Sequence, residues 1–563
     1  MKNTLYLFVL LLSTMLSAQS SQPETEFINP LKVPLVLAGN FGELRSNHFH
    51  SGLDIKTQQR TGLEVLASAS GTVSRIKIQR YGYGKALYID HPNGYTTVYA
   101  HLKRFSPEIE AYVKKRQYDK ESYAIEIFPK AGELTVTQGE VVAYSGNTGG
   151  SGGPHLHFEI RDKNARPMNP MQFGINIEDT RAPVLNDLFV YPLSDSSEVN
   201  NSQLPQKLRF TKQSNNSFLS EKITAYGKIG FGIGAIDQQN GANNHNGIYK
   251  VETSFNGEQN VEIMMDKFSF AETRYINRMI DYEYFETKRD RVQKLFVERN
   301  NPLSIYKEAS DKGVLNLTEE GYDYVYNVNI YDFKGNRTSV LVPITVKKDT
   351  ILQPKEIVKT DYFAQADQNL NINLNKYSVY IPKGAFYDDY YLDVYEKDNK
   401  LHLHEDIIPL QKSVTITADI SEYKPEDRDK LYIGSVGYND KLYYTGSRLN
   451  GDKLSASTRN LGDYAIGIDN TGPRIKSEGL EDGKWMSKYN TLKFKITDDK
   501  SGIKSFRATV NGKFILMEYD YKTDQLVHDF SDGVVTDSEN DFKLIVTDNV
   551  GNSSTFTAKF YRK

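Results

Sequence analysis

The chain has 563 residues, enough for three or four domains, and its net charge of −3 at pH 7 leaves no basic excess with which to bind a nucleic acid. It contains no cysteine, which excludes disulfides and thiolate zinc sites, so any metal must be held by His, Asp or Glu. The 38 Tyr, 27 Phe and 40 Gly predict a mainly β protein.

Residues 1–18 have the pattern of a secretory signal peptide. Lys2 gives a positive start, an apolar run covers 5–12, and Ser17-Ala18 offers small residues for cleavage. A membrane anchor is disfavoured because the run is too short to cross a bilayer, and no later segment approaches a transmembrane length. We therefore expect an exported mature chain without a transmembrane segment, located in the periplasm, the cell envelope or the extracellular space.

The segment 24–178 alternates short apolar runs with glycine-rich turns. Val65, Ala67 and Ala69 follow a spacing of two, and "HPNGY" at 91–95 is typical of a hairpin turn. A period of two belongs to strands that bury one face. We predict one antiparallel β-sheet domain here.

Two later stretches resemble each other and predict a repeated module. "DTRAPVL" at 179–185 is similar to "DNTGPRI" at 469–475, each with an Asp and a Pro before a strand. "VNIYDFKGNRTSVLV" at 328–342 and "LIVTDNVGNSSTFTA" at 544–558 share a strand, an Asp, a Gly-Asn turn and a second strand. We expect three β-rich modules: Ig-like β-sandwiches at 179–346 and 469–563, and a module of less certain shape at 355–468.

Residues suited to metal chemistry gather in the first third of the chain, which holds six of the ten histidines. In "HFHSGLDI" at 48–55, His50 and Asp54 are four residues apart, and the neighbouring Gly52 favours a strand on which both point to one side. "HLHFEI" offers His155 and His157 on one face of a strand. Two imidazoles and one carboxylate, with a fourth position open to water, describe a catalytic rather than a structural zinc site.

Five stretches of this region occur in the order found in a known family. They are "FGELRSNHFHSGLDI", "GTVSRI", "GYGKALYIDHPNGYTTVYAHL", "GEVVAYSGNTGGSGGPHLHFEIR" and "RPMNPMQF", which together cover roughly 39–173. The chain resembles the zinc metallopeptidases of the lysostaphin/LytM type, family M23. The resemblance implies an exported zinc metalloendopeptidase that hydrolyses peptidoglycan stem peptides or cross-links.

The resemblance also implies a role for each matching residue. Zn²⁺ is expected on His50, Asp54 and His157, while His101 and His155 act on the substrate and the transition state. Which of these two is the base and which stabilises the oxyanion stays open. All five positions are present, which argues against inactive relatives that only regulate other enzymes.

One segment departs from the family pattern. Residues 103–135 are longer than the usual connection and include "SPEIEAYVKKRQY" at 106–118, where Ser106 as N-cap and Pro107 at the first helical position predict a short helix. We expect this segment to matter as a wall or lid over the substrate groove.

Three alternatives stay open: a non-catalytic wall-binding or regulatory protein, a peptidase of exported proteins, and an adhesion protein. The C-terminal β modules would position the enzyme on the wall or on a protein partner, or act as passive spacers.

A second His-Leu-His pair, at His402 and His404, lacks both a neighbouring His-x-x-x-Asp and a glycine-rich approach, so a strand surface is the preferred interpretation. Glu159 lies two residues after His157 and shares its face. It is expected either as a partner of a ligand imidazole or as half of a strand salt bridge.

Overall fold

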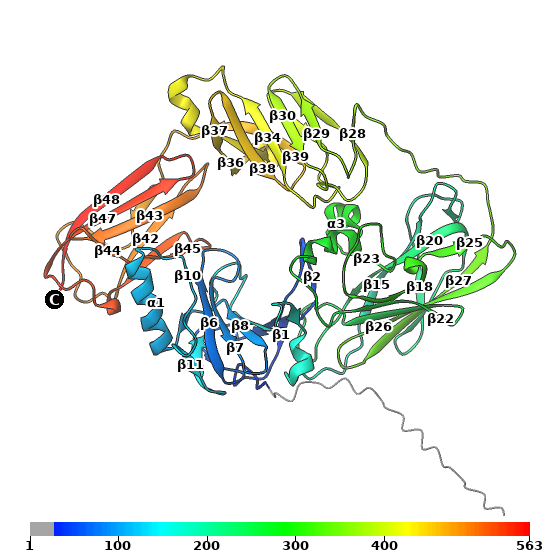
Figure 1. Cartoon of the computed structure of the whole chain (residues 1–563), viewed down its shortest axis with the longest axis horizontal. Helices are drawn as coiled ribbons and strands as arrows, with labels where there is room; N and C mark the ends of the chain where they lie inside the picture. The colour runs from blue at the N-terminus through cyan, green and yellow to red at the C-terminus, as the bar shows by residue number, and fades with distance from the viewer. Residues whose placement is uncertain (1–26) are drawn as a thin grey trace, which may run out of the picture.

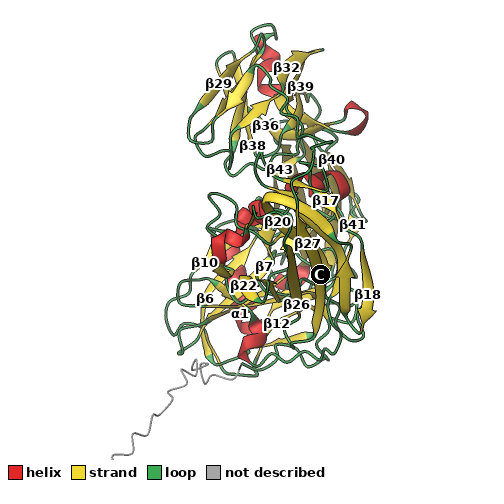
Figure 2. Ribbon diagram, turned by 90° about the vertical axis from the view of Figure 1, so that its right-hand side faces the viewer, coloured by secondary structure: helices red, strands yellow, loops and turns green. Residues whose placement is uncertain are grey.

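The structure, a computed structural model, describes residues 27–563. The expected signal peptide at 1–18 lies outside the described residues. Strands provide most of the regular structure (Figure 2), which confirms the mainly β fold class. Among the described residues, no helix is both long enough and apolar enough to cross a membrane.

The N-terminal domain is built on an antiparallel sheet with the strand order β1-β4-β13-β8-β7-β6-β10. Its strands are β1 (Leu37–Gly39), β4 (Leu53–Lys56), β13 (His155–Arg161), β8 (Thr96–Ala100), β7 (Lys85–Asp90), β6 (Gly71–Ile78) and β10 (Ile125–Ile127). β7 and β8 form the hairpin predicted around 91–95. A second sheet contains β5 (Glu64–Leu66), β12 (Val141–Tyr144) and β9 (Arg104–Phe105).

Strand β13 positions the candidate site residues through the alternation of its side chains and through its register with the neighbouring strands. Leu156, Phe158 and Ile160 point into the core, where each is 0% exposed, so the histidines at 155 and 157 occupy the opposite face. His157 pairs in register with Asp54 on β4 and with Ala100 on β8. The sheet therefore brings three separate segments of the chain to one point.

The segment 103–135 forms helix α1 (Pro107–Asp119), which begins after Ser106 as predicted and buries Ile109 and Val113. After the helix, β10 and β11 (Thr135–Val136) both pair with β6. Since β6 lies toward the opposite edge of the sheet from β4, these strands widen that edge instead of covering β13. Instead of the expected wall or lid, residues 103–135 form an extension of the sheet and helix α1. This helix contacts the C-terminal module, which is described below.

The first β module continues directly from the N-terminal domain. Its main sheet runs β17-β15-β20-β27-β26-β21-β22-β24. The strands are β17 (Gln206–Lys207), β15 (Val184–Pro192), β20 (Ile223–Ile236), β27 (Arg337–Val346), β26 (Asp323–Tyr331), β21 (Lys250–Phe255), β22 (Glu258–Met264) and β24 (Tyr306–Ala309). Phe268 of this module packs against Phe41 and Phe49 of the N-terminal domain, with ring centroids 5.1 and 5.4 Å apart. One hydrophobic core therefore runs through both parts.

The middle module has two five-stranded sheets around a core of its own. The first contains β29 (Leu370–Asn373), β30 (Tyr377–Ile381), β34 (Val414–Asp419), β38 (Lys453–Thr458) and β37 (Arg448–Asn450). The second contains β32 (Val394–Lys397), β33 (Lys400–Leu403), β39 (Gly462–Ile468), β35 (Leu431–Val436) and β36 (Leu442–Gly446).

The C-terminal module is a second two-sheet unit with a separate core. One sheet has β40 (Arg474–Ser477), β42 (Thr491–Thr497), β46 (Gln525–Asp529) and β45 (Glu518–Asp520). The other has β41 (Lys484–Trp485), β48 (Ser553–Tyr561), β47 (Glu539–Asp548), β43 (Ile503–Val510) and β44 (Lys513–Ile515).

The four parts follow one another around a ring (Figure 1). The first and middle modules touch through Tyr275 and Tyr387, whose ring centroids are 5.5 Å apart. The C-terminal module returns to the N-terminal domain, where Lys85 Nζ lies 2.9 Å from Glu518. Between the first and middle modules, residues 350–359 are all exposed and belong to neither core. The first part of this connection is nevertheless held against the first module, where the Leu352 N–H donates to the Asn201 carbonyl at 2.8 Å.

Candidate metal centre

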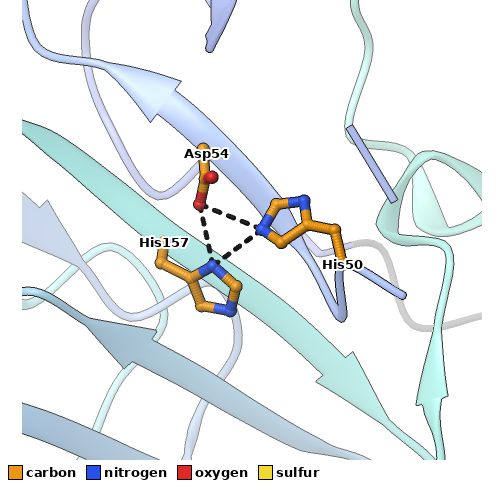
Figure 3. A group of neighbouring side chains, drawn as sticks. All are labelled: His50, Asp54 and His157. Atoms are coloured by element: carbon orange, nitrogen blue, oxygen red, sulfur yellow. Dashed lines mark hydrogen bonds and ion pairs between the residues drawn. The ribbon is translucent and has the colours of Figure 1, made fainter. Parts of the chain in front are cut away.

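Three side chains predicted as metal ligands meet at one point (Figure 3). Asp54 Oδ1 lies 3.1 Å from His50 Nε2 and 2.8 Å from His157 Nδ1, and the two imidazole nitrogens are 3.1 Å apart. All three residues are buried, with 2 to 5% of their surface exposed. Segments up to 107 residues apart in the sequence thus place three donor atoms within contact distance.

His50 reaches this point by a different route from the one the sequence predicts. It does not share a strand with Asp54, because β3 (His48–Phe49) ends before it and β4 begins three residues after it. The connection passes Gly52, where an added Cβ would lie 2.3 Å from the carbonyl oxygen of Phe158. The glycine thus allows β4 to run close beside β13.

The hydrogen bonds on the far sides of the two imidazoles determine which nitrogen faces the site. His50 Nδ1 is 2.7 Å from the carbonyl oxygen of Asn40, and His157 Nε2 is 2.8 Å from Glu159 Oε1. Both oxygens only accept, so these nitrogens carry the hydrogens. The nitrogens that face Asp54, His50 Nε2 and His157 Nδ1, are therefore the ones with lone pairs available to a metal.

Glu159 is both a partner of His157 and part of a salt bridge, so its two expected roles coexist. Its Oε2 accepts from Arg161 Nε at 2.6 Å, while Oε1 also accepts from Ser51 Oγ at 2.7 Å and from the Tyr83 hydroxyl. The Tyr83 ring stacks on His157 with centroids 5.2 Å apart. Sequence reasoning identified Glu159 from its spacing but missed Tyr83 and Ser51, which no local pattern connects to the site.

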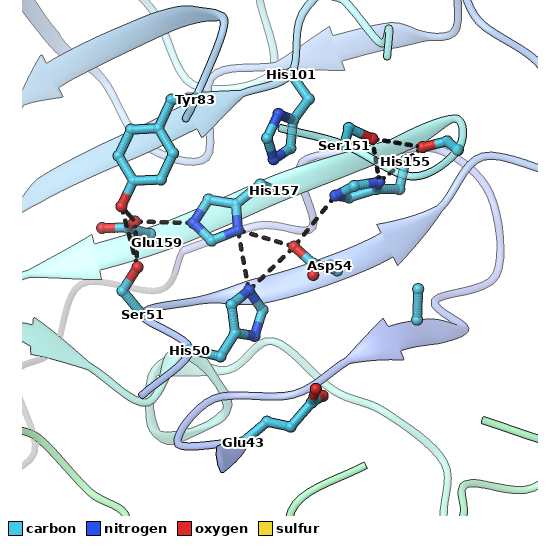
Figure 4. A network of polar contacts seen from close by, with 12 residues as sticks. Glu43, His50, Ser51, Asp54, Tyr83, His101, Ser151, His155, His157 and Glu159 are labelled. Carbon is cyan, nitrogen blue, oxygen red and sulfur yellow. Dashed lines mark hydrogen bonds and ion pairs between the residues drawn. The ribbon is translucent and has the colours of Figure 1, made fainter. Parts of the chain in front are cut away.

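The two remaining histidines stand beside the three candidate ligands (Figure 4). His101 follows β8 in a left-handed conformation with φ 58°, and its Nδ1 donates to the carbonyl oxygen of Thr148 at 2.8 Å. His155 Nδ1 donates to the carbonyl oxygen of Gly153 at 2.9 Å. Because carbonyl oxygens only accept, both rings keep Nε2 as the nitrogen free to take a proton. The two ring centroids are 4.7 Å apart.

Burial and close charges shift the pKa values of this cluster. Burial opposes protonation of His157, but hydrogen bonds to Asp54 and Glu159 outweigh it and raise the pKa of His157 to about 9. Burial also opposes ionisation of Asp54, yet the charge of His50 and the hydrogen bonds of the imidazoles hold the pKa of Asp54 well below its usual range. Burial, followed by the charges of His157 and His155, lowers the pKa of His101 to about 3. Asp54 and Glu159 thus favour a positive charge on His157, whereas burial keeps His101 neutral.

Zinc fits this donor set. Tetrahedral zinc with ligands at about 2.0–2.1 Å separates neighbouring ligand atoms by about 3.3 Å, close to the distances among His50, Asp54 and His157. His155 Nε2 lies 3.3 Å from Asp54 Oδ1, at the edge of this group. The three lone-pair atoms of His50, Asp54 and His157 that face one position are stabilised by a cation there.

The second His-Leu-His pair has different surroundings. His402 on β33 stacks on Tyr395 with centroids 4.6 Å apart, and its Nδ1 lies 2.6 Å from Asp463. His404 Nδ1 accepts from the backbone N–H of Asp393 at 3.1 Å. The first histidine pairs across a strand surface and the second stands at a turn with φ 56°.

Comparison with known proteins agrees with this geometry. Residues 48–118 and 128–170 match the profile of Peptidase family M23, and residues 361–469 match that of a Zu5-like domain. DD-carboxypeptidase/endopeptidase Mpg of Neisseria meningitidis is 36% identical over 132 residues, which are 23% of this chain and 24% of that protein. Peptidoglycan DD-endopeptidase ShyB of Vibrio cholerae is 31% identical over 128 residues, covering 23% and 24%.

Solved structures include a zinc containing peptidase from Vibrio cholerae, 26% identical with a TM-score of 0.20, which covers 26% of this chain and 40% of the other. The chain spans about a quarter of the length of the curated relatives it matches. The gap in the family match, 119–127, falls inside the longer segment 103–135. The matched residues contain all five candidate positions: His50, Asp54, His101, His155 and His157. Within residues 48–170 this chain carries a domain of peptidase family M23.

Proposed function

We propose that the chain is an exported, zinc-dependent endopeptidase that hydrolyses peptide bonds in peptidoglycan stem peptides or cross-links. The observation that carries the proposal is the convergence of His50 Nε2, Asp54 Oδ1 and His157 Nδ1, no two of them more than 3.1 Å apart. The substrate class rests on relatives named as peptidoglycan DD-endopeptidases.

Zinc bound by these three residues would supply a Lewis acid that polarises the scissile carbonyl and lowers the pKa of water. His101 and His155 hold Nδ1–H on backbone carbonyls, so each presents Nε2 to the reacting atoms. One ring takes the proton of the attacking water on Nε2, and the other, once protonated there, donates to the oxyanion that forms on the substrate. The shared orientation of the two rings supports this pairing without deciding the order.

The β modules would place the domain against its polymeric substrate or a protein partner. The first module supports the metal-binding segment directly: Asn40, whose carbonyl orients His50, is held by Gly247 through two hydrogen bonds of 2.6 and 2.8 Å. This contact gives the first module a structural part in the site beyond spacing.

Digestion of purified peptidoglycan tests the proposal. Wild-type protein should release soluble fragments, lose this activity in chelator and regain it with zinc. His157→Ala should lose both zinc and activity, whereas His155→Ala should keep zinc and lose activity by about 10²–10⁴-fold. His402→Ala, which alters the second His-Leu-His pair, is the matched control and should behave as wild type.

Activity that survives both His157→Ala and His155→Ala would end the proposal. Wall binding without digestion would favour a non-catalytic wall-binding protein. Cleavage of exported proteins with intact wall would instead favour a peptidase of that class.

A further inference from the structure

A second group of possible metal ligands lies away from the zinc-binding residues, where the N-terminal domain joins the first β module. Asp179 belongs to the connection, Asp237 follows β20, and Asp332 follows β26. One carboxylate oxygen from each lies within 4.8 Å of the other two. Two oxygens bound to the same calcium ion at about 2.3–2.6 Å are at most about 5 Å apart, so this spacing fits one ion.

The carboxylates border a small cavity together with polar atoms that lack a hydrogen-bond partner. A cavity of about 20 Å³ is bordered by Asp179, Asp237, Asp332 and Asn246. Such a volume holds one water molecule or one ion. Asp237 Oδ1 and Asn246 Oδ1 are buried without any hydrogen-bond partner, and their residues are only 6% and 4% exposed. Buried oxygens of this kind normally have a partner, so these two indicate a ligand.

The protein offsets the negative charge at this place only in part, through the charge of Arg181, which acts on Asp179 and Asp237. Within residues 27–563, none of the three carboxylates has a Lys, Arg or His nitrogen within 4.0 Å. Lys334 borders the cavity, but its ammonium group donates to Asn176 Oδ1 at 2.7 Å. A cation held between the three carboxylates would remove their mutual repulsion.

The same arrangement recurs in the C-terminal module, at Asp469, Asp498 and Asp548. In both modules an asparagine side chain spans the group. Asn336 Nδ2 donates to Asp332 Oδ2 at 2.6 Å and to the Asp179 carbonyl at 3.3 Å. Asn552 donates to the corresponding atoms of Asp548 and Asp469 at 2.8 and 2.7 Å. The repeat shows that the linker Asp and the turn Asp belong to one local framework.

We propose that Asp179, Asp237 and Asp332, with Asn246, bind a hard divalent cation, calcium, at the junction of the N-terminal domain and the first β module. All the proposed donors are oxygen atoms, which suit Ca²⁺. The imidazole nitrogens of the other centre suit Zn²⁺ instead. We assign the site to this module because here a cavity and two unpartnered oxygens accompany the carboxylates.

At this position, a bound cation would hold the N-terminal domain and the first β module together. The cavity is also bordered by Leu37 and Asn40 of the N-terminal domain. Leu37 N–H donates to Gln239 Oε1 at 2.9 Å, and the Asn40 carbonyl accepts from His50. An ion held by the linker and by two loops of the module therefore fastens the joint beside the segment that carries a zinc ligand.

Calcium titration of the full-length chain after dialysis against EGTA tests the assignment. By calorimetry, Asp237→Asn and Asp332→Asn should each bind one calcium ion fewer per chain than wild type. His157→Ala should bind as many as wild type, which separates this site from the zinc centre. Calcium should raise the thermal midpoint of wild type by several degrees and leave that of Asp237→Asn nearly unchanged.

A second measurement guards against variants that merely misfold. In EGTA, Asp237→Asn should melt at or above the wild-type temperature because it removes a buried, repelled charge; in calcium the order should reverse. The proposal is overturned if wild type binds no calcium up to about 10 mM, beyond the range of extracellular calcium modules. It is equally overturned if Asp237→Asn and Asp332→Asn, folded by circular dichroism, bind as many ions as wild type.

Discussion

Each candidate zinc ligand is oriented by a group on its far side. The carbonyl of Asn40 orients His50, Glu159 orients His157, and Arg45 Nη2 donates to Asp54 Oδ2 at 2.7 Å. Such outer partners fix the tautomer of an imidazole and raise its basicity toward a metal. If the site binds zinc as proposed, its affinity would depend on residues that never touch the ion.

Glu159→Gln tests this dependence. The amide retains the shape of the side chain but loses the charge that strengthens His157, and it weakens the contact to Arg161. We expect zinc affinity to fall by about 10–100-fold, measured by competition with a chromogenic chelator. Glu126→Gln, on β10 of the same sheet, is the control and should leave the affinity unchanged. Equal affinities for all three proteins would contradict the role of Glu159.

At the residue scale, the sequence predicts which side chains share a face where their spacing matches a strand. His155, His157 and Glu159 follow the period of a strand, so their common face was predictable from β13 alone. Tyr83 was not, because its hydroxyl meets Glu159 across 76 positions of sequence. Nor was the placement of His50 outside a strand, which depends on how close the backbone at Gly52 comes to Phe158.

At the scale of elements, β46 carries a buried histidine, His528, from which we predict a pH dependence of the C-terminal module. His528 is 0% exposed, and its Nδ1 donates to the Leu516 carbonyl at 2.9 Å. Burial lowers the pKa of His528, an effect that Asp532 and Asp529 oppose and Lys114 of α1 reinforces. The folded module therefore binds this proton only at a lower pH than the unfolded chain does.

We expect the stability of the C-terminal module to fall as the pH is lowered. The unfolded histidine takes up a proton below about pH 6.5, so the stability that neutral His528 contributes is complete above that pH and is lost as the pH falls. Urea unfolding of the C-terminal module, followed at pH 7.5 and 5.5, should show a smaller loss for His528→Gln than for wild type. An identical loss in both proteins would exclude His528 as the cause.

Element positions were well predicted where one signal dominates. Ser106 and Pro107 placed the start of α1 correctly, because the fixed φ of proline is a local effect, although the Ser106 side chain makes no capping hydrogen bond. The partner of α1 was beyond prediction: the Tyr118 hydroxyl contacts Asp532, 414 residues further along the chain. No periodicity within the helix identifies which module it contacts.

At the scale of the molecule, the N-terminal domain and the first module depend on each other. Phe41 and Phe49 are each 1% exposed because they pack on Phe268. A fragment of residues 27–178 would expose both rings, at a cost of about 2 kcal/mol each. We expect this fragment to aggregate or to melt well below residues 27–346, as measured by light scattering and calorimetry. Equal melting temperatures would show that the shared core contributes little.

The C-terminal module contacts the glycine-rich loop at residues 146–153, which lies beside the candidate catalytic histidines. Lys522 Nζ donates to the carbonyls of Asn147 and Ser151, and the Tyr521 hydroxyl donates to that of Gly149 at 3.3 Å. The carbonyl of Thr148 in the same loop orients His101. The last module is thus connected through one loop to an imidazole of the site.

Lys522→Ala should loosen that loop without touching the zinc ligands. We expect peptidase activity to fall by about 10–100-fold, since small misplacements of catalytic groups are costly, while the zinc content stays the same. Lys513→Ala, an exposed lysine of β44, is the matched control. Wild-type activity in Lys522→Ala would show that the loop keeps its shape unaided.

Because the four parts of the chain form a closed ring, a single cut in the backbone leaves a second connection between the two pieces. A protease that cuts once within residues 350–359 severs the backbone, but the halves remain joined through Tyr275 and Tyr387 on one side and through Lys85 and Glu518 on the other. Such a nicked molecule would migrate as one species in a native gel and as two bands after boiling in detergent. Survival after a single scission is thus a property of the ring and not of any one module.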